Sequence, residues 1–137
     1  MNRSDLKSVA EIRLKEAKAL LNKRYYDGAY YLTGYAVECA LKSCIAKKTK
    51  RYDFPDRRIV NDSYTHDLNQ LIKVAGLQEA LNSEMQRDRD FEVHWAIVKD
   101  WSEGSRYERY DAAAAKSIYT AVSDDRHGVL RWLKRLW

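Results

Sequence analysis

The segment from Tyr25 to Lys48 reads YYDGAYYLTGYAVECALKSCIAKK and decides the fold class of this chain. Small and apolar residues recur in it every three or four positions, which is the pattern of one long amphipathic helix. They are Tyr26, Ala29, Tyr30, Thr33, Val37, Ala40, Leu41 and Cys44. Gly28 and Gly34 interrupt good helix formers, at a cost of roughly 1 kcal/mol each relative to alanine in an exposed helix interior. We therefore expect another backbone to pack closely against this helix, at the centre of a small bundle.

A carboxylate, Glu38, lies on this helix with Lys42 one turn later. The two residues have the spacing of an ion pair on a helix surface, which contributes only a few tenths of a kcal/mol. The neighbours of Glu38 on the helix are Tyr31, Gly34 and Tyr35. In these surroundings, a buried carboxylate paired with an arginine is the favoured interpretation.

The chain has 137 residues, the size of one domain, and we predict a single helical domain over residues 1–137. Charged residues make up 33% and hydrophobic residues 45%, which excludes a disordered or membrane-embedded chain. The uncharged run from Gly28 to Val37 is too short to span a bilayer. The N-terminal segment contains Asp and Glu and lacks an apolar signal core. We therefore expect a cytoplasmic protein that does not act at a membrane.

The cysteine pattern indicates neither a disulfide nor a metal site. Cys39 and Cys44 lie five positions apart on the predicted helix, about 140° apart around its axis, so they do not pair with each other. No CxxC motif or Cys/His cluster indicates a metal. The sequence predicts neither a metal nor a cofactor.

The net charge of +5 is concentrated in two segments. Residues 47–58 contain six basic residues against two acidic ones, and residues 124–137 contain four against two. Basic clusters of this kind meet polyanions such as RNA. The candidate contacts in the first segment are Lys47, Lys48, Lys50 and Arg51. The alternative is that both segments are solvated loop and helix faces.

The rest of the chain has helical periodicity without a competing strand pattern. Helices are predicted over residues 4–22, 27–48, 65–76, 77–85, 91–101 and 111–133, the last with a bend near residues 124–128; residues 49–64 are predicted as a loop and 102–107 as a turn. The predicted N-caps are Asp27 or a residue just before it, Thr65 and Asp111, and Gly76 ends its helix. We predict an all-α, up-and-down bundle of four long helices plus a short helix.

Four segments, in this order, resemble the HEPN family (higher eukaryotes and prokaryotes nucleotide-binding). The first is LKEAKALLNKRYYDGAYYLTGYAVECALK at residues 14–42, similar to the two opening helices of the family. The second is THDL at residues 65–68, similar to the HDL segment that opens the third helix. The third is WSEGSRY at residues 101–107, similar to the SRY turn, and the fourth is the alanine-rich last helix. Together they cover roughly residues 10–125.

The resemblance implies an HEPN-like fold and a homodimer that binds nucleotide or RNA. It also implies a prokaryotic toxin–antitoxin or defence-type module, with a partner such as a nucleotidyltransferase. Arg106 and Tyr107 are the expected nucleotide- or RNA-binding residues, and pairing of Arg106 with Glu38 or Asp67 is the alternative. His66 is a further candidate contact. We favour a neutral, hydrogen-bonded His66, because a protonated ring in the first turn of a helix meets an unfavourable dipole.

The resemblance also leaves a catalytic alternative open. Catalytic members of the family carry an arginine, four to six residues, and then a histidine; Arg89 and His94 fit this spacing, and Arg87 fits its upper limit. In such a metal-independent ribonuclease, the imidazole moves a proton at the 2′-hydroxyl or the leaving oxygen, and the guanidinium holds the phosphate. Two protomers complete the site, so one chain supplies half of it. The alternative for His94 is a structural role beside Trp95.

The tyrosines between Tyr25 and Tyr35 also allow two interpretations. Aromatic rings beside cations hold single strands by stacking on their bases. Tyrosines at helical spacing more often pack in a core or a dimer interface, and we favour packing. A third class of function is a non-catalytic dimerisation scaffold, in which the basic segments only add solubility.

Overall fold

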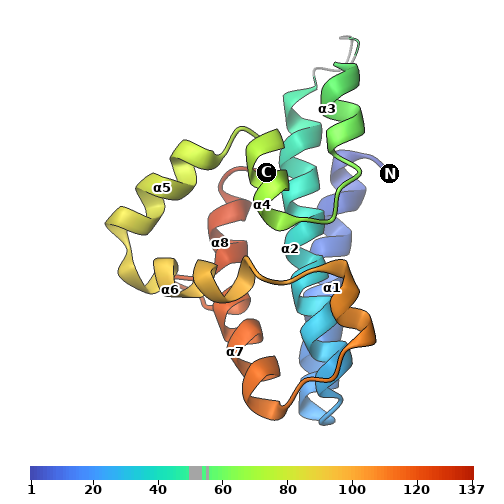
Figure 1. Cartoon of the computed structure of the whole chain (residues 1–137), viewed down its shortest axis with the longest axis vertical. Helices are drawn as coiled ribbons and strands as arrows, with labels where there is room; N and C mark the ends of the chain where they lie inside the picture. Colours follow the sequence, from blue (N-terminus) through green and yellow to red (C-terminus); the bar gives the residue numbers. More distant parts are fainter. Residues whose placement is uncertain (50–53, 55) are drawn as a thin grey trace.

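The computed structural model describes residues 1–49, 54 and 56–137, and within them the chain forms helices and their connections (Figure 1). The elements are α1 (Arg3–Asn22), α2 (Tyr26–Lys48), α3 (Arg57–Asp62), α4 (Leu68–Val74), α5 (Gln78–Arg87), α6 (Arg89–Val98), a short 3-10 helix η1 (Glu103–Tyr107), α7 (Ala112–Ser123) and α8 (Val129–Lys134). The predicted all-α class is confirmed.

Helix α2 is the centre of the molecule. It contacts α1, α4, α7, α8 and η1, and its residues from Ala36 to Leu41 are all buried. Burial around its circumference explains why its sequence is richer in small residues than a one-sided amphipathic helix requires. In the described part of the chain, no helix is long and apolar enough to cross a membrane.

The helices are more numerous than predicted, because α3 lies in a predicted loop and the last predicted helix is two helices, α7 and α8. The carboxylate of Asp88 accepts hydrogen bonds from the backbone N–H groups of Asp90 and Phe91, which makes it the N-cap of α6 and ends α5. The predicted bend in the last helix is a full break between α7 and α8. A Cβ on Gly128 would lie 2.4 Å from the carbonyl oxygen of Asp124, so the break winds too tightly for a side chain there.

The predicted loop over residues 49–64 is partly wrong, because α3 lies within it. The helix begins after Asp56, whose side chain accepts a hydrogen bond from the Arg58 N–H at 2.8 Å. At six residues, α3 is too short to show the apolar periodicity by which helices are found in a sequence.

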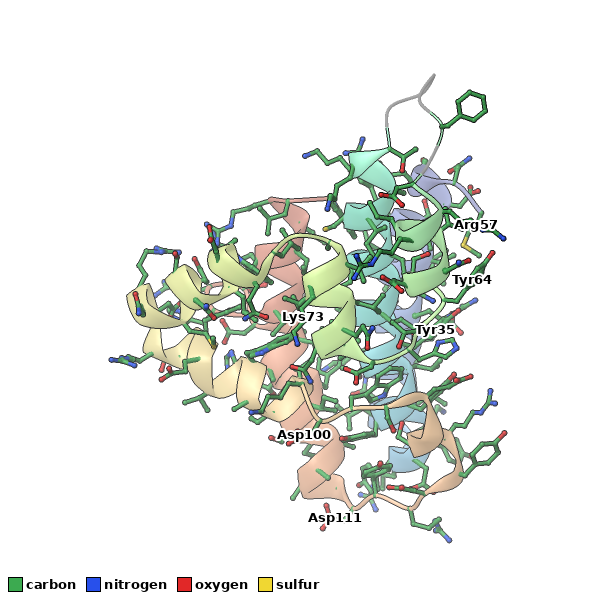
Figure 2. All side chains as sticks on the ribbon, turned by 45° about the horizontal axis from the view of Figure 1, so that its top comes forward. Tyr35, Arg57, Tyr64, Lys73, Asp100 and Asp111 are labelled. Carbon is green, nitrogen blue, oxygen red and sulfur yellow. The ribbon has the colours of Figure 1, made fainter. Side chains whose placement is uncertain are left out.

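Of the predicted helix ends, Asp111 and Gly76 are confirmed (Figure 2 labels Asp111 at the start of α7). The Asp111 carboxylate accepts from the Ala114 N–H at 2.8 Å, and Gly76 has a φ of +71°, the left-handed region that glycine tolerates. Thr65 is wrong as a cap. The α4 N-cap is Asp67, and the Thr65 hydroxyl accepts from the Asp67 N–H instead.

The start of α2 also differs from the prediction. Its N-cap is Tyr25, which makes no side-chain capping bond, and Asp27 lies inside the first turn. The Asp27 carboxylate accepts instead from the Arg109 guanidinium and from the Tyr110 N–H, between η1 and α7. The acidic residue therefore holds a distant loop against α2.

Close packing against Gly34 is confirmed, although a ring approaches α2 there and not a backbone. The indole of Trp101 is 2% exposed, and a Cβ on Gly34 would lie 2.2 Å from it. Tyr31 packs beside the same indole, with ring centroids 5.8 Å apart. Tyr30 stacks on Tyr110 with centroids 3.7 Å apart. These tyrosines pack in the fold, as favoured from their spacing.

We expect Gly34→Ala to destabilise the protein, although alanine is the better helix former. The added methyl group meets a buried indole that has no room to move, and overpacking of this kind costs about 1–3 kcal/mol. Urea unfolding followed by tryptophan fluorescence measures the change. Gly104→Ala is the matched control, because its Cβ would meet only the Ser102 hydroxyl at 3.6 Å. Equal stability of the two variants would contradict the packing described here.

Candidate functional site

The structure brings three of the predicted site residues together beside the middle of α2. His66 lies just before α4, whereas Arg106 and Tyr107 lie in η1. A glutamate that the sequence analysis did not single out, Glu103, joins them. We call the linked residues Glu38, Lys42, His66, Glu103 and Arg106 the Glu38–Arg106 network.

The network starts at a buried carboxylate. The Glu38 side chain is 3% exposed, and it contacts His66 Nδ1 at 2.9 Å and Lys42 Nζ at 3.4 Å. Burial of Glu38 is confirmed, but the expected arginine partner is wrong. Arg106 reaches neither Glu38 nor Asp67 among the contacts of the described residues; it contacts Glu103 at 3.6 Å.

The imidazole of His66 bridges two carboxylates. Its Nδ1 faces Glu38, and its Nε2 lies 3.1 Å from Glu103 Oε2. A carboxylate only accepts hydrogen bonds, so both contacts are satisfied when both ring nitrogens carry hydrogens. The predicted hydrogen bond to the bundle is confirmed. His66 directly precedes the N-cap Asp67, so it lies outside the first turn of α4, where we expected it.

The outer end of the network presents a cation beside an aromatic ring. The guanidinium of Arg106 lies 4.9 Å from the centroid of the Tyr107 ring. The Arg106 side chain is 45% exposed and Tyr107 is 79% exposed. An exposed aromatic residue next to an exposed guanidinium has the chemistry to stack on a base and hold a phosphate.

The predicted basic contacts lie farther away, at the C-terminal end of α2. Lys47 donates to the Leu136 carbonyl at 3.4 Å and Lys48 to the Val74 carbonyl at 3.2 Å. Both ammonium groups thus satisfy backbone acceptors at the ends of α8 and α4, where a positive charge is favourable. Lys47 lies nine positions after Glu38 on α2, about 14 Å along the helix axis at 1.5 Å per residue. Lys50 and Arg51 lie outside the described residues.

The predicted catalytic pair lies on α6, away from the network. Arg89 is the first residue of α6 and pairs with Glu92 at 3.1 Å, with 77% of its side chain exposed. His94 Nδ1 lies 2.9 Å from the His127 carbonyl oxygen. At about 100° per residue, Arg89 and His94 project from α6 about 140° apart. The helix therefore does not direct the two side chains to one point within a chain.

The hydrogen bond between His94 and the His127 carbonyl oxygen shows which ring nitrogen of His94 carries the hydrogen. A carbonyl oxygen only accepts, so Nδ1 donates, and in the neutral ring the lone pair is then on Nε2. A neutral imidazole with a free Nε2 lone pair is the form that a general base requires.

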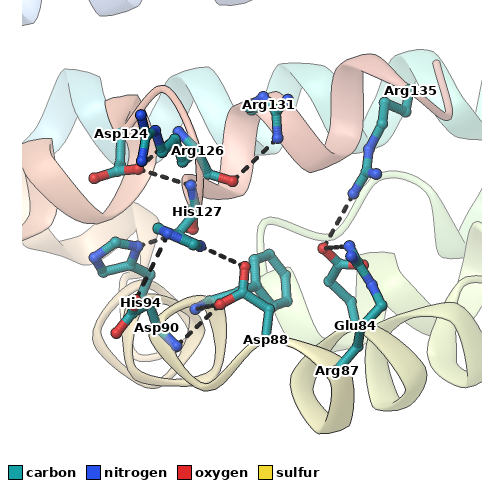
Figure 3. Close-up of polar contacts among 11 residues, drawn as sticks. Glu84, Arg87, Asp88, Asp90, His94, Asp124, Arg126, His127, Arg131 and Arg135 are labelled. Atoms are coloured by element: carbon teal, nitrogen blue, oxygen red, sulfur yellow. Dashed lines mark hydrogen bonds and ion pairs between the residues drawn. The ribbon is translucent and has the colours of Figure 1, made fainter.

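A second charged cluster surrounds His127, in the loop between α7 and α8 (Figure 3). His127 Nδ1 lies 2.6 Å from Asp88 Oδ2, and its Nε2 lies 3.6 Å from Asp90 Oδ2. The hydrogen bond that His127 donates to the Asp88 carboxylate raises the pKa of His127 above its ordinary value, and the same bond lowers the pKa of Asp88. Two backbone N–H groups, of His127 and Arg126, lower the pKa of Asp124.

One donor atom from each of Asp88, Asp90 and His127 lies within 4.8 Å of the others, a spacing that also fits a metal ion. However, each imidazole nitrogen faces a carboxylate, which favours a protonated ring without a lone pair for a metal. We therefore interpret the cluster as an ion-pair cluster. The sequence drew attention to none of these pairings, because 39 residues separate Asp88 from His127.

The two cysteines offer no nucleophile to either region. Both are free and buried, and burial raises the pKa of each thiol to about 11. The thiols are therefore protonated at neutral pH and unreactive.

The comparisons with known proteins identify the family. The model of the HEPN domain matches residues 4–136. The chain belongs to the HEPN family. Comparison with curated proteins and with solved structures gave no match. In this HEPN domain, three segments that carry the family resemblance meet at the Glu38–Arg106 network: α2, the residues before α4, and η1.

We expect Glu38→Gln to destabilise the domain by about 1–3 kcal/mol, because it removes the buried acceptor of a charged hydrogen bond. Urea unfolding of the variant and the parent protein measures this loss. Glu103→Gln is the matched control, because the Glu103 side chain is 37% exposed and exposed pairs contribute less than about 1 kcal/mol. A Glu38→Gln variant as stable as the control would show that the buried carboxylate is dispensable.

Proposed function

We propose that this HEPN domain binds a nucleotide or RNA through Arg106 and Tyr107, on the exposed face of η1. The observation that supports the proposal is the exposed guanidinium beside an exposed phenol ring, anchored to buried Glu38 through Glu103 and His66. An anchored arginine loses less side-chain freedom on binding a phosphate than a free one does. The net charge of +5 attracts such a ligand at a distance.

The proposal includes the wider role that the family resemblance implies. The domain acts as a homodimer in a prokaryotic toxin–antitoxin or defence-type module, with a partner such as a nucleotidyltransferase. In this role it is a binding module. Lys47 and Lys48 are additional candidate basic contacts, as are Lys50 and Arg51 from the sequence alone. The bonds of Lys47 and Lys48 to backbone carbonyls make Arg106 the stronger candidate for the primary phosphate contact.

We expect Arg106→Ala to weaken binding of a fluorescent single-stranded RNA at least tenfold, because a guanidinium–phosphate contact is lost. The plot of log affinity against log salt has a negative slope, and the magnitude of this slope decreases by about 0.7, the contribution of one phosphate on a single strand. Fluorescence anisotropy over a salt series measures both quantities, with labelled ATP as a second ligand. Tyr107→Ala weakens binding with little change in slope, because it removes stacking and no charge.

Lys116→Ala is the matched control for charge, because Lys116 is exposed on α7 and its loss lowers the net charge equally. If Lys116→Ala and Arg106→Ala weaken binding equally, the ligand binds a diffuse basic surface and not a specific site at Arg106. No binding by the parent protein to RNA or ATP would favour the dimerisation scaffold.

A metal-independent endoribonuclease is the second candidate, and the hydrogen bond of His94 favours it. This bond leaves the Nε2 lone pair available as a base. Arg89 projects away from His94, so in this mechanism a second protomer supplies the phosphate-binding side of the cleft. The step is transfer of the 2′-hydroxyl proton to Nε2 as the oxygen attacks the adjacent phosphorus. The bond from phosphorus to the 5′-oxygen of the next nucleotide breaks, which leaves a 2′,3′-cyclic phosphate and a 5′-hydroxyl that takes its proton from water.

If the domain is a nuclease, it cleaves a labelled mixed RNA in EDTA, and His94→Ala and Arg89→Ala each lower the rate at least a hundredfold. Gel analysis of initial rates with equal amounts of folded protein measures the loss. Glu92→Gln is the control, because it removes the partner of Arg89 and leaves both candidate residues in place. Cleavage retained in His94→Ala would reject this mechanism.

A further inference from the structure

The loop from Asp124 to Gly128 contacts α6 twice through a single residue, His127. The His127 side chain lies between the carboxylates of Asp88 and Asp90, at 2.6 Å and 3.6 Å. The His127 backbone carbonyl accepts from His94 Nδ1 at 2.9 Å. Figure 3 shows both contacts, the ring toward the start of α6 and the carbonyl toward His94.

The loop has little freedom to change one contact without the other. The Asp124 carboxylate accepts from the backbone N–H groups of Arg126 at 2.8 Å and His127 at 2.7 Å. The Gly128 N–H donates to the Asp124 carbonyl at 3.1 Å, which closes the turn. Because these bonds hold the loop backbone as one unit, a displacement of the loop away from α6 would break the ring contact and the carbonyl contact together.

We propose that the α7–α8 loop is a proton-dependent clamp on α6, closed while His127 is protonated and released when it is neutral, and that the clamp sets the orientation of His94. A protonated ring donates to both aspartates. A neutral ring has one hydrogen, so one of its nitrogens presents a lone pair to a carboxylate and repels it. Loss of the ring contacts leaves the bond from His94 to the His127 carbonyl as the remaining attachment of His127 to α6, and displacement of the loop then withdraws the carbonyl from His94.

The surrounding charges favour the protonated ring. The charged and titratable groups around it are Arg87 from α5; Asp88, the N-cap of α6; Asp90 and His94 from α6; Asp124, Asp125 and Arg126 from its own loop; and Arg131 from α8. The Arg87 guanidinium contacts Glu84, and the Arg131 guanidinium donates to the Arg126 carbonyl, so neither contact involves the imidazole. Asp88 and Asp90 face the imidazole.

The direction of the pH dependence follows from the two partners. The pKa of His127 is raised above 6.5, so its stabilising contribution is complete below that pH and is lost as the pH rises through the folded-state pKa. The pKa of Asp88 is lowered from 3.8, so its contribution is present above that pH and is lost as the pH falls through its own folded-state pKa. The clamp is therefore closed in mildly acid solution and opens on the alkaline side.

The test is a proton NMR titration of the imidazole signals of the full chain, assigned by single substitution of each of the three histidines. We expect His127 to titrate above pH 6.5, and the ring signals of His94 to report a transition with the same midpoint. Asp88→Asn should lower both midpoints together. Asparagine also caps helices well, so this variant keeps the start of α6 and removes only the charge.

Asp100→Asn is the matched control, because Asp100 is an exposed aspartate after the end of α6, and it should leave both midpoints unchanged. Urea unfolding gives a second readout. The fall in the urea midpoint between pH 5.5 and 8.5 should be smaller in Asp88→Asn than in the parent protein. A His127 midpoint at or below 6.5, or His94 signals that do not follow it, would overturn the proposal. These measurements involve neither RNA nor a partner, so their outcome is independent of the proposed functions.

Discussion

The buried carboxylate of Glu38 is the constraint on which the rest of this HEPN domain depends. It lies in the middle of the most buried helix, where an unpaired charge costs several kcal/mol. Lys42, from the same helix, and His66, from the segment before α4, compensate it. The second nitrogen of His66 then holds Glu103 and, through it, Arg106. The pairing that the buried Glu38 carboxylate requires thus determines where the exposed side chain of Arg106 lies.

Two histidines in this structure hold separate segments together by the same means. His66 bridges Glu38 and Glu103, and His127 bridges Asp88 and Asp90. In both cases one imidazole lies between two carboxylates and connects segments that are distant in the sequence. His127 differs in having its carbonyl bound to His94, which links its charge to a second imidazole.

The site was predictable where a short segment has its own chemistry. Arg106 and Tyr107 follow a turn, and His66 belongs to an HDL segment, so all three were named from the sequence and lie in one region. Glu103 was missed, although its position three residues before Arg106 is the spacing of a helical ion pair. The pairing of His127 had no signal at all, because contacts between distant residues leave no periodic pattern in one sequence.

The helical class, the central place of α2 and the helix ends at Gly76 and Asp111 were predictable from the sequence. These features follow from local physical chemistry: apolar spacing, small residues, backbone freedom and side-chain capping. The sequence did not predict that Glu38 pairs with His66 and not with an arginine, that Lys48 satisfies the end of α4, or that α7 and α8 are separate helices. The physical reason is that a buried charge or an unpaired carbonyl takes whichever partner the packing of the helices brings within reach, and that packing depends on the whole chain.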